Sequence, residues 1–319
     1  VDYIERDQVM YTSETQRGAT WGLARISHRR KLTLGTFNKY EYDSDGGKDV
    51  TVYVIDTGVY VDHKDFEGRA TWGKTIPSGD DDVDGNGHGS HCAGTIAGKT
   101  YGVAKKANIV AVKVLRSNGS GSMSDVVGGI VFASEQHLER QKSEGSKYRG
   151  SVANMSLGGG KSRALDDAVT RAIKTGLHFA VAAGNDNKDA CNYSPANVET
   201  AVTVGASTLS DDRAYFSNHG ECVDIFAPGL NIKSVWNNGG TNTISGTSMA
   251  SPHVAGLIAY YLSIAPASTS AFHSGPMTPS EMKAYLIERA TDGALSDLPK
   301  NTVNKLIYNN IVDSAFYAW

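Results

Sequence analysis

The chain has 319 residues, of which 40% are hydrophobic and 20% are charged, and its net charge is −3 at pH 7. No composition break or proline-rich linker divides it, so we expect one large α/β domain rather than two small ones. The weak negative charge gives no electrostatic case for nucleic acid or an anionic membrane as a partner, and the longest apolar run, residues 254–262, is about half of the roughly 18–20 residues that a membrane span needs.

The first residues of the chain differ from those that follow. Residues 1–7 alternate as a short strand does, whereas residues 8–18 are polar and show no regular period. Taken alone, this pattern predicts an N-terminal edge strand followed by a loop.

A buried strand is predicted at residues 50–55, because this run is rich in β-branched and aromatic residues. The strand ends on Asp56. In a parallel α/β sheet, a carboxylate at the C-terminal end of a strand is in the usual place for chemistry. Asp56 is therefore a candidate catalytic residue.

Residues 68–75 match the phosphate-binding loop pattern Gly-x-x-x-x-Gly-Lys-Thr letter for letter. This match supports a nucleotide-binding protein as the alternative function. A phosphate-binding loop runs directly into a helix, however, and here Pro77 and Gly79 oppose a helix. The acidic residues 80–82 would also repel a phosphate.

A second helix of small residues is predicted to begin at His88. His91 and Cys92 follow at helical spacing, so a zinc site made of His88, His91 and Cys92 is another alternative. Such a site lacks a dedicated fourth ligand and leaves Ser248 without a role. We favour a buried Cys92 thiol on the side of the helix that carries His88.

The middle of the chain contains two glycine-rich segments, residues 117–122 and 151–160, which taken alone read as loops. A second buried strand is predicted in residues 179–185, and it ends on Asn185. Cys191 and Cys222 make an even pair in loop-like segments, so we predict a disulfide between them.

A tight Gly-Thr-Ser turn is predicted to open an apolar helix at Ser248. Free backbone N–H groups and the helix dipole favour developing negative charge at such a position. Pro252 fits this prediction if it belongs to the first helical turn, which needs no N–H donors. The alternative role for Ser248 is that of a simple helix cap.

Three segments together resemble the signature motifs of the subtilisin-like serine proteases: residues 54–58, 87–94 and 246–252. Their central residues Asp56, His88 and Ser248 follow in the order that subtilisin has. The resemblance covers nearly the whole chain and is strongest to the proteinase K branch, in particular to fungal vacuolar proteases of the cerevisin type. It implies an α/β fold whose mostly parallel central sheet has helices on both faces, and a serine endopeptidase.

The resemblance also implies a substrate site. The two glycine-rich segments correspond to backbone rails that hold an extended peptide as an added strand, and Asn185 corresponds to the side-chain donor of the oxyanion hole. The implied substrate-binding residues are Gly119, Ser120, Gly121, Ser156, Leu157, Gly158, Ala182 and Gly184. Their small and apolar character implies a hydrophobic or aromatic residue before the cut.

A structural calcium ion is a further expectation from the resemblance, although the chemistry requires no cofactor. Asp224, with the backbone carbonyls of Glu199 and Ala201, corresponds to a calcium site of proteinase K. The alternative is a solvated aspartate at the start of a strand.

The resemblance finally implies how the chain is divided and where it acts. Residues 1–18 resemble the end of an inhibitory propeptide and residues 19–319 the catalytic domain, with an ordinary edge strand as the alternative for the first segment. We expect proteins and peptides as substrates, the protein's own propeptide as inhibitor, and neither nucleic acid nor membrane as partner. We also expect a monomer in the vacuole, with secretion as the alternative.

Overall fold

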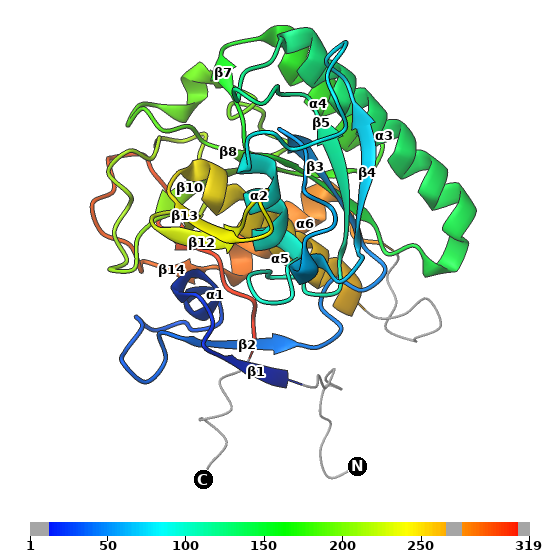
Figure 1. The fold of residues 1–319 in the computed structure, drawn as a ribbon. Coiled ribbons are helices and arrows are strands. Elements are labelled where there is room, and N and C mark those ends of the chain that lie inside the picture. The colour runs from blue at the N-terminus through cyan, green and yellow to red at the C-terminus, as the bar shows by residue number, and fades with distance from the viewer. Residues whose placement is uncertain (1–12, 266–275, 312–319) are drawn as a thin grey trace, which may run out of the picture.

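The computed structural model describes residues 13–265 and 276–311 (Figure 1), so the strand predicted at residues 1–7 lies outside the described residues. A sheet of nine strands forms the centre, in the order β14-β15-β11-β10-β8-β6-β3-β5-β4. All neighbouring pairs are parallel except β14 and β15. Its strands are β3 (Thr51–Asp56), β4 (Ala70–Thr75), β5 (Asn108–Lys113), β6 (Ser151–Met155), β8 (His178–Ala182), β10 (Val202–Ser207), β11 (Ile225–Pro228), β14 (Thr291–Asp292) and β15 (Lys305–Leu306).

Strand β3 lies in the sheet between β6 and β5, and it confirms the strand predicted at residues 50–55. Every residue of β3 is buried. Because successive side chains of a strand point to opposite faces, Val52 and Val54 enter one core and Tyr53 and Ile55 enter another. A strand that is apolar on both faces has to be covered on both.

Helices provide that cover. On the face of Val52 and Val54, α2 (His88–Ala97) and α5 (Thr247–Ile264) share a core with α1 (Trp21–Ile26) and α6 (Pro279–Arg289). Helix α5 is buried around almost its whole circumference, as expected for a helix without a polar face. On the other face lie α3 (Met123–Glu144) and α4 (Arg163–Lys174) (Figure 1). The predicted α/β fold, mostly parallel with helices on both faces, is confirmed.

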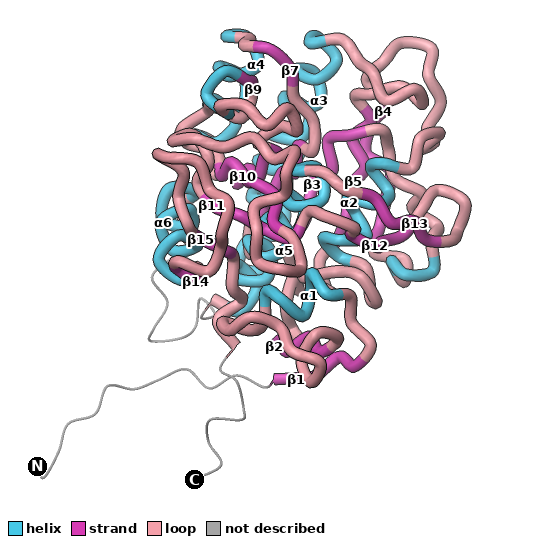
Figure 2. Tube along the Cα trace, turned by 90° about the vertical axis from the view of Figure 1, so that its left-hand side faces the viewer, coloured by secondary structure: helices cyan, strands magenta, loops and turns pink. Residues whose placement is uncertain are grey.

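Smaller elements complete the chain. Three antiparallel pairs join β1 (Ser13–Arg17) to β2 (Lys39–Asp43), β7 (Gly159–Gly160) to β9 (Tyr193–Ser194), and β12 (Ile232–Val235) to β13 (Thr241–Ile244). Short 3₁₀ helices span Lys64–Phe66, Gly145–Lys147 and Ala190–Asn192. Strands β1 and β7 lie at opposite ends of the molecule in both views (Figures 1 and 2).

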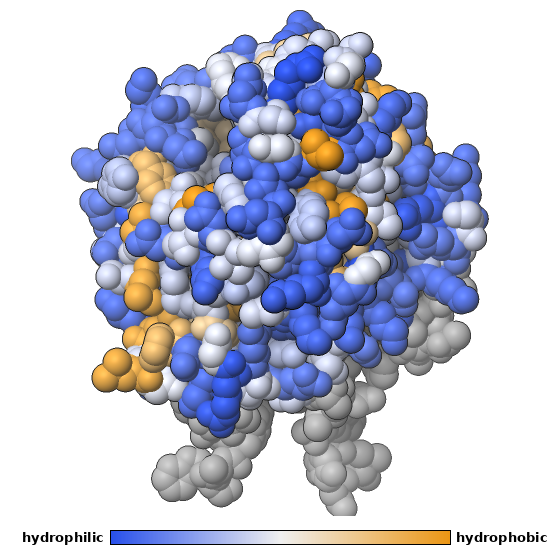
Figure 3. Space-filling model, viewed as in Figure 1, coloured by the Kyte–Doolittle hydropathy of each residue, from blue (hydrophilic) through white to orange (hydrophobic). Residues whose placement is uncertain are grey.

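The face seen in Figure 3 is mainly hydrophilic, with apolar side chains exposed only in separate places. Among the described residues, no helix has both the length and the apolar character needed to cross a membrane.

Candidate active site

Asp56 and His88 form a hydrogen-bonded pair at the carboxyl end of β3. The Asp56 side chain is fully buried, and its Oδ1 lies 2.7 Å from Nδ1 of His88. The backbone N–H of Thr57 donates to the same oxygen at 2.7 Å. Since an ionised carboxylate only accepts hydrogen bonds, Nδ1 carries the proton and Nε2 is the ring nitrogen that can accept another.

The environment of His88 changes its pKa. Burial of the ring opposes a positive charge, but the charge and hydrogen bond of Asp56, together with the charge of Asp84, outweigh this effect. The pKa of His88 is therefore raised above its usual value of 6.5. The same partners that fix the orientation of the ring also stabilise its protonated form.

Asp84 holds the start of α2, a role that the sequence analysis missed. This buried carboxylate accepts hydrogen bonds from the backbone N–H groups of Gly87 at 2.8 Å and Ser90 at 3.0 Å, and from the hydroxyl of Thr57 at 2.9 Å. A negative charge near a helix N-terminus is favourable. The available signal was an aspartate four residues before the predicted helix start.

Helix α2 approaches the end of β3 closely because Gly89 has no side chain. A Cβ atom added to Gly89 would lie 2.1 Å from the backbone oxygen of Gly58 and 3.2 Å from Cβ of Asp56. A larger residue would therefore push His88, the adjacent residue, away from Asp56.

Ser248 is the second residue of α5, which begins at Thr247. Its hydroxyl donates to the backbone oxygen of Ser156 at 3.0 Å. Pro252 lies beyond the first helical turn, so the prediction that its missing N–H would be superfluous there is wrong. The carbonyl of Ser248, which would accept that N–H, instead accepts the hydroxyl of Ser156 at 2.8 Å and the thiol of Cys92 at 3.4 Å.

Asn185 follows β8, and its side chain is oriented by Thr247. The amide oxygen Oδ1 accepts hydrogen bonds from the backbone N–H of Thr247 at 2.8 Å and from its hydroxyl at 2.9 Å. Because a backbone N–H can only donate, this contact assigns Oδ1 and leaves Nδ2 for other partners. A Cβ atom added to Gly246 would lie 3.5 Å from the backbone nitrogen of Ser248 and 3.6 Å from Nδ2 of Asn185, so both donors lie near one point.

The residues His88, Asn185 and Ser248 line a cleft formed by two adjoining cavities, of about 530 Å³ and about 280 Å³. Both cavities are bounded by Leu157, Gly158, Gly159, Asn185 and Ser248. The larger cavity also has His88, Gly119, Ser120, Gly121 and Ser156 in its lining, and the smaller one has Ala182, Gly184 and Thr247. Every residue that the sequence analysis named for substrate binding thus lies on this cleft.

The segment that matches the phosphate-binding loop pattern does not have the backbone geometry that a nucleotide-binding protein needs. Residues Ala70–Thr75 form β4, a strand of the central sheet paired with β5. Lys74 and Thr75 therefore lie on a strand and not at a loop-to-helix junction, which phosphate binding by this motif requires.

The described residues also do not form the alternative zinc site of His88, His91 and Cys92. Nε2 of His91 lies 2.9 Å from the backbone oxygen of Ile232. Within residues 13–265 and 276–311, the ligand atoms that do lie within 4.8 Å of one another belong to Asp56, His88 and Cys92. Burial, reinforced by the nearby charge of Asp56, raises the pKa of the Cys92 thiol well above its usual value, so it remains a protonated donor to Ser248 rather than a thiolate ligand.

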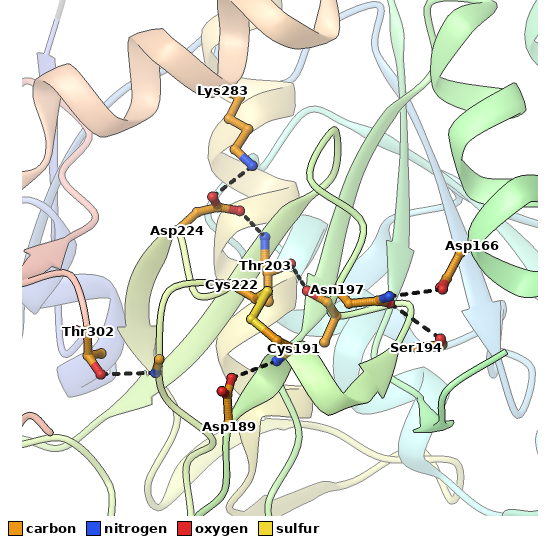
Figure 4. Close-up of a disulfide and its surroundings, with 12 residues drawn as sticks. Asp166, Asp189, Cys191, Ser194, Asn197, Thr203, Cys222, Asp224, Lys283 and Thr302 are labelled. Atoms are coloured by element: carbon orange, nitrogen blue, oxygen red, sulfur yellow. Dashed lines mark hydrogen bonds and ion pairs between the residues drawn. A yellow bond between two sulfur atoms is a disulfide. The ribbon is translucent and has the colours of Figure 1, made fainter. Parts of the chain in front are cut away.

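The cysteine predictions are confirmed. Cys191 and Cys222 form a disulfide (Figure 4), and Cys92 is free and buried.

The three groups predicted to hold calcium meet at a lysine. Nζ of Lys283 lies 2.6 Å from the backbone oxygen of Glu199, 2.8 Å from that of Ala201 and 2.7 Å from Oδ1 of Asp224. Calcium binds oxygens at about 2.3–2.6 Å and would need the point where this ammonium group lies. With Lys283 in place, these residues do not fit a calcium ion.

The mostly parallel sheet with helices on both faces, the Asp56–His88 pair at the end of β3, and the cleft that His88 and Ser248 line together define an α/β protein of subtilisin-like architecture. The chain belongs to the Subtilase family, Peptidase S8, which matches residues 47–307.

Two curated fungal relatives and one solved structure illustrate the similarity. Subtilisin-like serine protease pepC of Aspergillus niger is 64% identical over 312 residues, covering 95% of this chain and 58% of the relative. Subtilisin-like serine protease Pen ch 18 of Penicillium rubens is 64% identical over 314 residues, covering 97% of this chain and 64% of the relative. The chain thus spans about three fifths of the length of these two relatives. The crystal structure of a cold adapted subtilisin-like serine proteinase matches with a TM-score of 0.82 and 48% identity, covering 93% of this chain and 100% of that chain.

Proposed function

We propose that the protein is a serine endopeptidase that cleaves peptide bonds of proteins through Ser248, His88 and Asp56. The observation that carries the proposal is the 2.7 Å hydrogen bond between Asp56 and His88 on the cleft that Ser248 also lines. The family membership and the relatives named serine proteases support the same activity.

In the proposed reaction, Ser248 attacks the scissile carbonyl and His88 takes the hydroxyl proton on Nε2. His88 later gives this proton to the leaving amine, while Asp56 keeps Nδ1 protonated and stabilises the imidazolium. The hydroxyl of Ser248 donates to the backbone oxygen of Ser156 in the free protein, so it has to exchange this acceptor for Nε2 of His88 before attack. Such rearrangement is common, because catalytic hydrogen bonds often form only with substrate bound.

The oxyanion would be held by Nδ2 of Asn185 and the backbone N–H of Ser248. Both donors lie near one point beside Gly246, and Thr247 fixes the amide before substrate arrives. Donors that are already oriented need no reorganisation when negative charge develops, which lowers the barrier selectively.

Substrate would bind as an extended strand along the segments that follow β5 and β6, which contribute Gly119, Gly121 and Gly158. The cavity of about 280 Å³ beside Gly158, Ala182 and Gly184 has room for a large apolar side chain, which supports a hydrophobic or aromatic residue before the cut. Sequencing the products of a peptide-library digest tests this specificity, and a preference for charged residues would contradict it.

The activity is tested by labelling with a fluorophosphonate and mapping the labelled peptide. We expect one modified residue, Ser248, in wild-type protein and no labelling of Ser248→Ala or His88→Ala. Ser248→Ala should also lose peptidase activity by several orders of magnitude, a scale known from subtilisin, a member of the same family, while its unfolding free energy changes by at most about 1 kcal/mol. Retained turnover in Ser248→Ala would overturn the proposed triad.

The oligomeric state, the inhibitor and the location are proposed from the family resemblance. We infer a monomer that is inhibited by its own propeptide and acts in the vacuole, with secretion as the alternative. Sedimentation of the purified protein tests the monomer, inhibition by an added propeptide tests the inhibitor, and imaging of the tagged full-length protein in its own cells tests the location.

A further inference from the structure

The contact of Lys283 with Asp224 joins α6 to the central sheet (Figure 4). The lysine projects from α6 and ends on three oxygens: the backbone oxygens of Glu199 and Ala201 and the carboxylate oxygen Oδ1 of Asp224. An ammonium group has three N–H donors, so each N–H has one acceptor. All three distances lie between 2.6 and 2.8 Å, the range of short, charge-assisted hydrogen bonds.

The charged side chains that form this site are largely buried. The side chains of Lys283 and Asp224 are each only 16% exposed. The second carboxylate oxygen of Asp224 accepts the backbone N–H of Thr203, in β10, at 2.8 Å. Asp224 is thus fixed from both sides, and its charge faces the ammonium group.

The helix that supplies the lysine is held independently of this contact. Thr278 and Glu281 form a capping box at the start of α6, and Met282 and Leu286 are buried in the core. These contacts set the direction of the Lys283 stem before any ion pair forms. Only the side chain of Lys283, and not its backbone, then has to be ordered when the ammonium group binds.

Charge balance favours the lysine over a divalent ion. The three oxygens that Lys283 binds belong to one carboxylate and two neutral carbonyls, so one ammonium group balances their charge. A Ca²⁺ ion would exceed the charge of these three groups by one and would still need several water ligands to reach six or more oxygens. It would also have to displace Lys283 from a nearly buried position.

We propose that Lys283 is a built-in cation that replaces calcium at this site. The ammonium group belongs to the chain, so its occupancy does not depend on the concentration of free calcium, whereas a bound ion stabilises only by mass action. Lys283 thereby ties α6 to the segments that precede β10 and β11, with or without calcium. This inference goes beyond the proposed peptidase activity and does not depend on it.

Removing the lysine should turn the site into a calcium site. Lys283→Ala removes the ammonium group and opens space, whereas Lys283→Met removes the charge but keeps the space filled. We expect the melting temperature of both variants in EDTA to be lower than that of wild type. Millimolar Ca²⁺ should then raise the melting temperature of Lys283→Ala alone, by about 5 °C relative to its effect on wild type.

Two controls assign the effect to this site. Adding Asp224→Asn to Lys283→Ala should abolish the calcium-dependent rise. Lys305→Ala, which removes a lysine that pairs with Asp292 at 3.4 Å, should not acquire a calcium-dependent rise. An equal calcium effect in wild type, Lys283→Ala and the double variant would overturn the proposal.

A calorimetric titration of folded wild-type protein tests the proposal even if the Lys283 variants fail to fold. Ca²⁺ is added to EDTA-treated wild type and to Asp224→Asn. Identical isotherms are expected, because the lysine already fills the site in wild type. If wild type showed a calcium-binding event that Asp224→Asn abolished, Asp224 would be a calcium ligand and the proposal would fail.

Discussion

Pro252 lies four residues after Ser248 in α5, and its missing N–H leaves the carbonyl of Ser248 to two side chains from other elements. One donor is Ser156, directly after β6, and the other is Cys92 in α2. The proposed nucleophile is therefore anchored through its own carbonyl to the helix that carries His88 and to the segment that lines the cleft. A helix hydrogen bond would have tied it only to α5.

This relationship predicts that Ser156→Ala destabilises the protein although Ser156 lies beside a cleft. The substitution removes the stronger of the two donors and leaves a partly buried carbonyl with a weak thiol partner, which costs about 1–3 kcal/mol. The unfolding free energy from urea titration measures the loss. Because Ser248 should then be held less firmly, we also expect a lower kcat.

The double-mutant cycle with Pro252→Ala isolates this cause. Alanine restores the N–H that can bond to the carbonyl of Ser248, so Ser156→Ala should cost less in the Pro252→Ala background. The unfolded-state effect of replacing proline cancels in the cycle. Equal costs in the two backgrounds would show that the hydroxyl of Ser156 stabilises the fold in some other way.

Asn185→Ala should lower kcat about 10²- to 10³-fold with little change in KM, a scale known from subtilisin, a relative. The reason is that Nδ2 would stabilise a charge that exists only after attack. Steady-state kinetics on one peptide substrate provides the measurement. A raised KM with an unchanged kcat would instead make Asn185 a substrate-binding residue.

The pH dependence of kcat/KM should report the environment of His88. A general base must be neutral, so activity falls as pH falls through the pKa of His88, which is raised above 6.5 mainly because the charge and hydrogen bond of Asp56 outweigh the opposing burial. We expect the acid limb of the profile to have its midpoint above pH 6.5.

Asp84→Asn provides the matched test, because Asp84 contributes a smaller part of the same shift and binds the backbone N–H groups of Gly87 and Ser90 at the start of α2. Removing its charge should move the acid limb to lower pH. The kinetic profiles of the two proteins are compared over pH 5–9, and a shift to higher pH would contradict the proposed electrostatics.

Strand ends and helix starts explain which parts of the site were predictable. Asp56 and Ser248 are recognisable because an apolar run stops or begins beside a polar residue, whereas the mostly parallel α/β fold was implied by the family resemblance. Lys283, Thr247 and Asp84 were missed because their roles depend on partners distant in the sequence or on the direction of one side chain. The prediction for Pro252 failed for a simpler reason, which is counting: Pro252 is the sixth residue of α5, and even a helix that began at Ser248 would have placed it beyond the first four N–H groups.

Buried histidines should make the protein less stable in acid. Burial lowers the pKa of His253 to about 4, although its hydrogen bond to Met249 opposes the shift. The unfolded chain, with a histidine pKa near 6.5, therefore takes up this proton first, and stability is lost as pH falls from about 6.5 to about 4. His253→Gln should reduce the slope of unfolding free energy against pH in this window by up to about 1.4 kcal/mol per pH unit. Parallel slopes for variant and wild type would contradict the assignment.

The last prediction concerns residues 1–18, which remain a proposed propeptide remnant. Ser13–Arg17 form β1, where Gln16 donates to the backbone oxygen of Thr100 at 2.9 Å and Thr15 donates to Glu41 at 2.7 Å. Since β1 and β7 lie at opposite ends of the molecule and β7 directly follows the cleft residue Gly158, a docked β1 is far from the cleft of its own chain (Figures 1 and 2). We therefore expect one molecule to cut the N-terminal segment of another.

Wild-type protein that begins at Val1 should acquire a new N-terminus between Val9 and Thr20, at a rate that rises with protein concentration. Ser248→Ala alone should remain intact, and a catalytic amount of wild type should trim it, because the variant is still a substrate. N-terminal sequencing of the three preparations decides the matter. Trimming of Ser248→Ala alone would assign the cut to another protease, and a fully active wild type that keeps Val1 would make residues 1–18 an integral part of the enzyme instead of a propeptide remnant.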